Sequence, residues 1–150
     1  MDTSEIREKL KCSLELAHIC SEIIVCTFFA AAYIALFTLA WGGGVLALIV
    51  GLLVLVPFLC WEGWRIRKIF REPGEYVFCK ATLSQPHSGK LRGVFYFTIV
   101  IETEERGRFV ANTAAIFQSS GWMGPLLEDY VNREVTVAYN LSTEQVVVIG

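Results

Sequence analysis

The feature that most constrains this chain is a long uncharged stretch near its N-terminus. Residues 23–61 contain no Asp, Glu, Lys or Arg and consist mainly of Ile, Leu, Val, Phe and Ala. As one α-helix the stretch would measure about 58 Å, roughly twice the hydrocarbon thickness of a bilayer. We therefore predict that it crosses a membrane twice.

Three consecutive glycines divide this stretch near its middle. Gly42, Gly43 and Gly44 favour a tight reversal, because glycine accepts the positive φ angles that such turns need. The spans then cover about residues 23–41 and 45–61. Each holds enough large apolar side chains to insert on its own, by about −3 to −7 kcal/mol on insertion scales.

Basic residues flank the two spans on their outer ends, and the turn between them has none. They are Arg7, Lys9 and Lys11 before the first span and Arg65, Arg67, Lys68 and Arg71 after the second. Cytoplasmic flanks carry the excess of Lys and Arg, so we expect a multi-pass protein of the cell membrane with both termini in the cytoplasm. A secretory signal peptide is disfavoured, because charged and polar residues precede the first span and a second span follows.

The chain divides into four predicted regions. Residues 1–22 form an amphipathic helix, in which Ile6, Leu10, Leu14 and Ala17 lie at helical spacing. That apolar stripe lies on lipid headgroups, or packs against the protein's own cytoplasmic domain or a partner. A transmembrane hairpin at 23–64, a basic linker at 65–74 and a cytoplasmic β domain at 75–150 follow.

From residue 75 onward the pattern changes to the alternation of β-strands. The clearest strand is 94–102, where Phe97, Ile99 and Ile101 share one face with Phe95 and are predicted core residues. The charged turn 104–107 makes a hairpin with the next strand, and Pro125 opens a short helix. The five predicted strands lie at about 76–83, 94–102, 108–112, 134–139 and 145–149.

The expected fold is a membrane α-helical hairpin plus a small all-β cytoplasmic domain, α+β overall. Five strands bury a core if the sheet curls into a partial barrel, either OB-like or SH3-like, which also hides the sheet edges. An open antiparallel sheet laid against the membrane-proximal helix is the alternative.

A two-span hairpin, a basic membrane exit and a β domain that closes on Val135, Val137 and Tyr139 resemble an uncharacterised family of bacterial membrane proteins. Members of that family often end in Gly-x-x-Val-x-Val-x-Tyr-Asp-Pro. Here Asn132 stands for the Gly, as asparagine tolerates positive φ, and Asn140 and Leu141 stand for Asp and Pro. The chain is also similar to the membrane-tethered OB domains of NfeD-like proteins, a resemblance that implies no known reaction.

Composition and motifs disfavour several functional classes. Lys and Arg number 13 against 15 Asp and Glu, a formal net charge of −2, so nucleic acid is not an expected partner. No GxGxxG, P-loop, HExxH, GxSxG or CxxC motif occurs, and we predict no enzyme, no cofactor and no metal site. The five cysteines are predicted to be free and buried.

Single titratable residues near the spans have ordinary interpretations. His87 lies in a Pro-Ser-Gly loop and is predicted to be a solvated turn residue. His18 is predicted to anchor the chain at the membrane interface. Glu22 abuts the first span, where it reaches water, so an ion pathway is disfavoured.

Two other features are candidate contact sites. Ala31 and Ala35, and likewise Ala47 and Gly51, have the small-xxx-small spacing that allows close helix packing. This packing serves the hairpin itself or self-association. The loop with Trp122 and Met123 carries large apolar side chains where polar ones are usual, so it covers the barrel mouth or contacts a partner or the membrane.

We therefore predict a membrane-anchored binding or scaffold module whose cytoplasmic β domain engages a protein partner, with the lipid bilayer as its other partner. The alternative is a homo-oligomeric small pore or transporter accessory subunit, because two spans enclose a path only when several copies assemble. An enzyme is the least favoured class.

Overall fold

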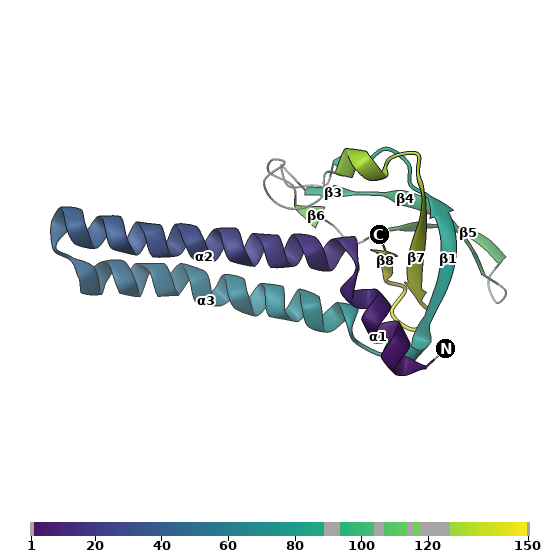
Figure 1. Cartoon of the computed structure of the whole chain (residues 1–150), viewed down its shortest axis with the longest axis horizontal. Helices are drawn as coiled ribbons and strands as arrows, with labels where there is room; N and C mark the ends of the chain where they lie inside the picture. Colours follow the sequence, from purple (N-terminus) through teal and green to yellow (C-terminus); the bar gives the residue numbers. More distant parts are fainter. Residues whose placement is uncertain (1, 89–93, 104–106, 114–115, 118–126, 150) are drawn as a thin grey trace. The chain divides into compact units, whose positions relative to one another are not determined.

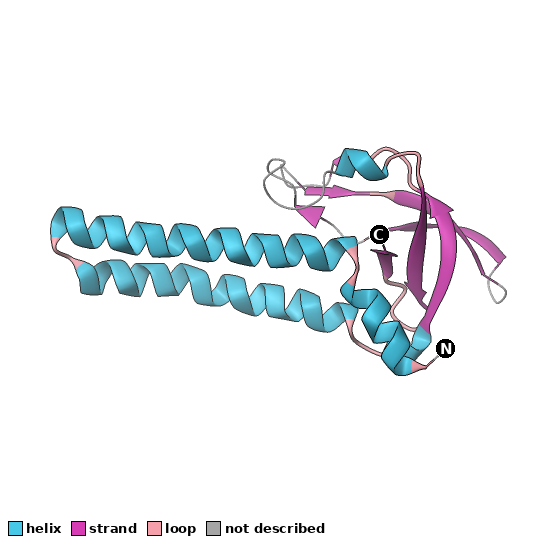
Figure 2. Ribbon diagram, viewed as in Figure 1, coloured by secondary structure: helices cyan, strands magenta, loops and turns pink. Residues whose placement is uncertain are grey.

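The computed structural model describes residues 2–88, 94–103, 107–113, 116–117 and 127–149. The chain forms two compact units, and we treat each separately. The helical unit is Ile19–Lys68, and the β unit combines Met1–His18 with Ile69–Gly150. Figure 2 shows the helices in cyan and the strands in magenta.

The helical unit consists of two long antiparallel helices joined by the glycine turn (Figure 1). Helix α2 (Leu14–Trp41) begins in the β unit and supplies the first arm, and α3 (Gly44–Ile69) supplies the second. Gly42 has φ 65°, the left-handed conformation that glycine adopts at low cost. Both helices are long and apolar enough to cross a membrane, as the sequence predicted.

Large apolar side chains of the helical unit point outward. Leu39 is 84% exposed and Phe28 is 68% exposed, and Leu53 is similarly open. A water-soluble helical pair buries such a stripe between its helices. Here apolar residues cover the outside of the pair, and by length and composition both helices are candidate membrane spans.

The N-terminal helix belongs to the β unit. Helix α1 (Thr3–Lys11) buries Ile6 and Leu10, and Leu14 at the start of α2 joins the hydrophobic core of this unit. Of the uses expected for the amphipathic stripe, packing on the protein's own β domain is therefore the one observed.

One continuous helix over 1–22 was expected, and the structure interrupts it. Helix α1 ends at Lys11 and α2 begins at Leu14. The interruption coincides with a long-range contact, an isolated antiparallel bridge between Ser13 and Ile149. The local hydrogen bonds of Ser13 are kept, because its N–H donates to the Leu10 carbonyl at 3.2 Å and its carbonyl accepts from Ala17 N at 3.1 Å.

The β unit contains three antiparallel sheets (Figure 1). The first has the order β1-β7-β8, the second pairs β4 with β5, and the third has the order β2-β3-β6. The strands are β1 (Tyr76–Thr82), β2 (His87–Ser88), β3 (Val94–Tyr96), β4 (Thr98–Thr103), β5 (Gly107–Asn112), β6 (Ile116–Phe117), β7 (Glu134–Asn140) and β8 (Val146–Ile149). Short 3-10 helices η1 (Pro73–Glu75) and η2 (Leu127–Tyr130) complete the unit.

One hydrophobic core joins these sheets. Phe97, Ile99 and Ile101 are almost fully buried, which confirms the predicted core face. Val137 and Val148 bring the β1-β7-β8 sheet to the same cluster. In β4, buried and exposed side chains alternate because only one face of the strand packs on this core.

The strand count differs from the five that were expected. The expected strand 94–102 is divided at Phe97, whose N–H donates to Thr113 Oγ1 at 2.9 Å instead of to a strand carbonyl. Short strands β2 and β6 pair with β3. These two-residue strands lack the period-2 run by which sequence identifies a strand. The helix expected from Pro125 is a 3-10 turn over its described residues, and Pro125 itself lies outside them.

Asn140 organises the turn between β7 and β8. Its buried Oδ1 accepts hydrogen bonds from the backbone N–H groups of Ser142 (3.1 Å) and Thr143 (2.9 Å), which forms an Asx turn. Its Nδ2 donates to the carbonyls of Arg71 and Glu72 and joins the turn to the segment before β1. Asn132 adopts φ 58°, the positive φ expected at this position.

Candidate functional site

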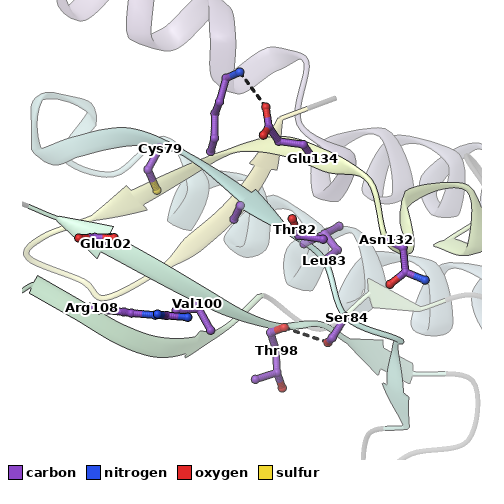
Figure 3. Close-up of a pocket in the computed structure, with 12 residues that line it drawn as sticks. Cys79, Thr82, Leu83, Ser84, Thr98, Val100, Glu102, Arg108, Asn132 and Glu134 are labelled. Atoms are coloured by element: carbon purple, nitrogen blue, oxygen red, sulfur yellow. Dashed lines mark hydrogen bonds and ion pairs between the residues drawn. The ribbon is translucent and has the colours of Figure 1, made fainter.

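A groove lies on the β unit and is lined mainly by residues of β1, β4 and the segments next to them. It has a volume of about 780 Å³. Figure 3 shows β1 on one wall and β4 on the other, approaching each other at Ser84 and Thr98 and separating towards Cys79 and Glu102. At the closed end, Ser84 Oγ donates to the Thr98 carbonyl at 2.9 Å. We call this feature the β1/β4 groove.

Both walls of the β1/β4 groove carry a positive and a negative side chain. On the β1 side, Lys80 Nζ donates to Glu134 Oε1 at 2.7 Å, and both side chains are largely exposed. This hydrogen bond to Glu134 raises the pKa of Lys80 above its ordinary value. On the β4 side, Glu102 lies opposite Arg108 in the β4–β5 register. The groove therefore has no net charge from these four side chains.

The outer face of the β4–β5 hairpin extends the groove wall. Val100 and Val110 are register partners and are 43% and 66% exposed. Beside them, Thr98 Oγ1 donates to Asn112 Oδ1 at 3.0 Å.

Cys79 lines the groove and carries a thiol, a side-chain group that can act as a nucleophile. Its Sγ donates to the Val137 carbonyl at 3.8 Å, and burial raises the pKa of the thiol. A thiol with a raised pKa forms little thiolate near neutral pH and is a poor nucleophile. The groove therefore offers recognition chemistry rather than covalent catalysis at this cysteine.

The helical unit holds a buried ionic cluster that sequence reasoning missed. Arg65 Nη1 donates to Glu22 Oε2 at 2.8 Å and to Glu62 Oε2 at 2.9 Å. Both carboxylate side chains are almost fully buried. Glu22 was expected to reach water, so this expectation is corrected. The guanidinium replaces water as its partner and connects α2 to α3.

The four small residues predicted for helix packing lie in different environments. Ala47 and Gly51 are buried, and a Cβ at Gly51 would come within 2.9 Å of Ile34 Cδ1. Ala31 and Ala35 are exposed. The second pair of small residues thus lies within the hairpin, whereas the first faces outward.

The remaining candidate residues are placed as follows. Trp122 and Met123 lie outside the described residues. His87 is exposed and its ring lies 5.5 Å from that of Tyr96, whereas His18 is fully buried. Cys12, Cys20 and Cys60 are exposed free thiols, contrary to the expectation that they are buried. Within the described part of the chain, no cluster of His, Cys, Asp and Glu could hold a metal ion.

Comparison with known proteins identifies no relative: no family model, no curated protein and no solved structure matches this chain.

Proposed function

We propose that the chain is a membrane-anchored binding module, with two spans in the cell membrane, both termini in the cytoplasm and a β unit that engages a protein partner. The observation that carries the anchor is the outward apolar surface of the helical unit, including Phe28, Leu36 and Leu53. Exposure of such side chains to water is unfavourable at about 25 cal/mol per Å², and a bilayer removes this cost.

The charges and aromatic rings at the end of α3 support the proposed orientation. Arg67 and Lys68 lie in its last turn, and the rings of Trp61 and Trp64 lie 5.3 Å apart at the same end. Tryptophan belts mark membrane interfaces, and Lys and Arg mark the cytoplasmic side.

The β unit is, in this proposal, a partial barrel of the OB-like or SH3-like kind, and the resemblance to NfeD-like proteins remains a prediction. A single core shared by β1, β4, β7 and β8 supports the partial barrel. The polar β1/β4 groove, beside the exposed Val100 and Val110, supports a protein as partner.

Cysteine accessibility in sealed cells tests the anchor and its orientation. In a background without native cysteines, Gly43→Cys should react with a membrane-impermeant maleimide added from outside. Ser88→Cys, an exposed position of the β unit, should react only after the cells are opened. External labelling of Ser88→Cys would reject the orientation, and extraction of the chain by alkaline carbonate would reject the anchor.

Proximity labelling tests the partner. A biotin ligase fused after Gly150 should label a set of neighbours that is lost when Val100 and Val110 are both changed to serine. Val77→Ser is the matched control, since Val77 is also an exposed valine of the β unit but belongs to β1 and not to the β4–β5 hairpin. Identical labelling by all three chains would contradict a partner at this face.

The exposed pair Ala31 and Ala35 favours self-association as the second candidate. A homo-oligomeric pore predicts oligomers that persist in mild detergent and ion conductance in planar bilayers. Ala31→Leu with Ala35→Leu should abolish both if these residues form the contact.

A further inference from the structure

We propose that strand β5 binds a second copy of this chain, whose own β5 pairs with it antiparallel and joins the two β4–β5 hairpins into one continuous sheet. This inference rests on the proposed function, because it names the polypeptide that the exposed Val110 of β5 contacts. Such a pairing has twofold symmetry, so each copy contributes the same strand edge.

The outer edge of β5 differs from the edges of the other long strands. β1 lies between β7 and β4, although it forms a ladder with β7 only. The outer edge of β8 is covered, because Val148 N donates to Glu15 and Ser13 bridges to Ile149. Among strands of four residues or more in the described part of the chain, β5 alone pairs with one strand and has no such partner on its other side. Unpaired edges of this kind are templates for another chain.

The ladder with β4 fixes which backbone groups lie on the free edge. Thr113 N donates to the Phe97 carbonyl at 2.9 Å, one step beyond the last pair of the β4–β5 ladder. Bonded and non-bonded pairs alternate along an antiparallel ladder. Arg108, Val110 and Asn112 therefore direct their N–H and C=O groups away from β4. No backbone hydrogen bond joins these groups to another described residue.

The side chains of β5 do not block pairing. Edge strands that avoid pairing carry lysine, proline or a bulge, and β5 has none of these. Its one charged side chain, Arg108, lies opposite Glu102 on β4. Val110 is 66% exposed, and its register partner Val100 is 43% exposed. The free edge is thus bordered by an apolar pair that a further strand would cover in part.

One register suits two copies of β5 better than its neighbours do. When Val110 lies opposite Val110 of the second copy, Arg108 lies opposite Asn112 of the second copy. This register forms about six backbone hydrogen bonds, two for each pair of outward residues. A shift by two residues places Arg108 opposite a valine, and a further shift places it opposite Arg108 of the second copy, where like charges repel.

The same register joins the exposed valines of the two hairpins. Val100 and Val110 of one copy then lie beside Val110 and Val100 of the other, across four neighbouring strands and on one face. Cross-strand contacts between β-branched side chains stabilise a sheet. Charge also favours a polypeptide here, because Arg108 is balanced by Glu102, whereas nucleic acids and anionic lipids need a net positive site.

Cysteine cross-linking of the full chain in cell membranes tests the pairing and its register. In a background without native cysteines, Val110→Cys should form a disulfide-linked dimer on mild oxidation, because directly opposite residues of a bonded pair have Cα atoms about 5.5 Å apart. Val100→Cys is the matched control, an exposed valine that lies about 14 Å, or three strand spacings, from its own copy. It should give about tenfold less dimer.

Two further single-cysteine chains test the register itself. Arg108→Cys alone and Asn112→Cys alone should each give about tenfold less dimer than Val110→Cys, because each lies about 14 Å from its own copy along the strand. Co-expression of the two chains should restore cross-linking, since residue 108 of one copy lies opposite residue 112 of the other. A contact between the membrane helices of two copies would not produce this pattern.

A proline in β5 tests whether backbone hydrogen bonds form the contact. Added to both chains of the Arg108→Cys and Asn112→Cys pair, Val110→Pro removes one outward N–H and no bond to β4, and should lower cross-linking by about tenfold or more. Val110→Thr is the control, which keeps the N–H and the β-branched shape and should change cross-linking by about twofold or less.

Hydrogen exchange on the full chain in micelles monitors the fold of Val110→Pro. The amides of Phe109 and Ala111, which bond to β4, should stay protected. A variant that unfolds is replaced by Asn112→Pro in the Val110→Cys chain, with Asn112→Ser as its control and the same expected effects.

Dimer formation by Val110→Cys no greater than by Val100→Cys would overturn the proposal, as would equal cross-linking with proline and threonine at residue 110. Equal dimer from Arg108→Cys alone would overturn the register and the pairing that depends on it. A cross-link from Val110→Cys to a different protein, without chain dimer, would assign the edge to another partner and also overturn the proposal. Loss of labelled neighbours in the double serine variant, alongside such a failure, would leave the membrane-anchored binding module intact.

Discussion

The two units place their apolar residues in opposite ways. In the β unit, Phe97 and Ile101 are fully buried, whereas in the helical unit Phe28 and Leu39 are mostly exposed. The helical unit instead buries charged side chains, among them Glu22 and Glu62. One chain thus combines a unit that packs its own apolar core with a unit that, in our proposal, is solvated by lipid. Substitutions should therefore obey different rules in each.

The largest expected effect comes from Phe97→Ala. Its ring is fully buried in the shared core, and loss of such a side chain lowers the free energy of unfolding by about 4 kcal/mol. Phe28→Ala makes the same chemical change at an exposed site of the helical unit and should leave the stability of the β unit within about 0.5 kcal/mol. Urea unfolding of the full chain in micelles, followed at β-unit amides, measures both. Equal losses of β-unit stability from Phe97→Ala and Phe28→Ala would contradict the difference between the two units.

The second effect concerns the buried charges of the helical unit. Arg65→Met leaves Glu22 and Glu62 facing each other without their shared cation. An uncompensated buried charge of this kind should destabilise the helix pair by about 3 kcal/mol. Changing both glutamates to glutamine in the same chain should recover most of the loss. Arg67→Met, at an exposed position, is the control.

Stability of the helix pair is measured as the detergent composition at which helix–helix contact is lost, with a fluorophore on each helix. A loss of stability with Arg67→Met equal to that with Arg65→Met would show that net charge, not the buried cluster, is the cause.

High pH should act on the β unit through Tyr76. Its hydroxyl donates to the Ile69 carbonyl at 2.9 Å, and burial, together with the charge of Glu15, raises the pKa of Tyr76 to about 12. The folded state thus holds this proton more tightly than the unfolded state, whose Tyr titrates near 10. The contribution of protonated Tyr76 to the free energy of unfolding is fully present below pH 10. It is lost as the pH rises towards 12, by about 2 kcal/mol after allowance for solvent screening.

Unfolding of the full chain between pH 9 and 12 checks this. Tyr76→Phe removes the titrating group, so it should start about 1 kcal/mol less stable, from the lost hydrogen bond, and then show a flatter pH profile. Parallel profiles for both chains would assign the alkaline loss to other groups.

Much of the architecture was predictable because it depends on local patterns. The uncharged stretch and the glycine triplet predicted two long helices with a turn at Gly42, and alternation predicted the core face at Phe97 and Ile99. The charged turn predicted the β4–β5 hairpin, whose register runs from Thr98↔Asn112 to Thr103↔Gly107.

The features that the sequence did not predict all join distant residues. The contacts of Glu22 with Arg65 and of Glu15 with Val148 cross many positions of the chain. Local pattern does not specify how far each helix rotates about its axis or which strand edge a side chain reaches. The β1/β4 groove depends both on the register of β1 with β7 and on that of β4 with β5. The alternation of apolar and polar residues does not fix either register by itself.

The smallest and sharpest test compares two glycines of α3. A Cβ at Gly51 would come within 2.9 Å of Ile34 Cδ1, whereas a Cβ at Gly63 would meet no atom within 4 Å. Gly51→Ala should destabilise the helix pair by about 1 kcal/mol through overpacking, because Ile34 must shift to admit the methyl group. Gly63→Ala should instead stabilise α3 by about 0.5 to 1 kcal/mol, because alanine loses less backbone entropy in a helix. The same fluorescence assay measures both variants. Stability changes of opposite sign would show that the helical unit packs its inner face tightly, as the β unit packs its core, although in our proposal its outside faces lipid. Stability changes of the same sign would mean that α2 and α3 do not meet at Gly51.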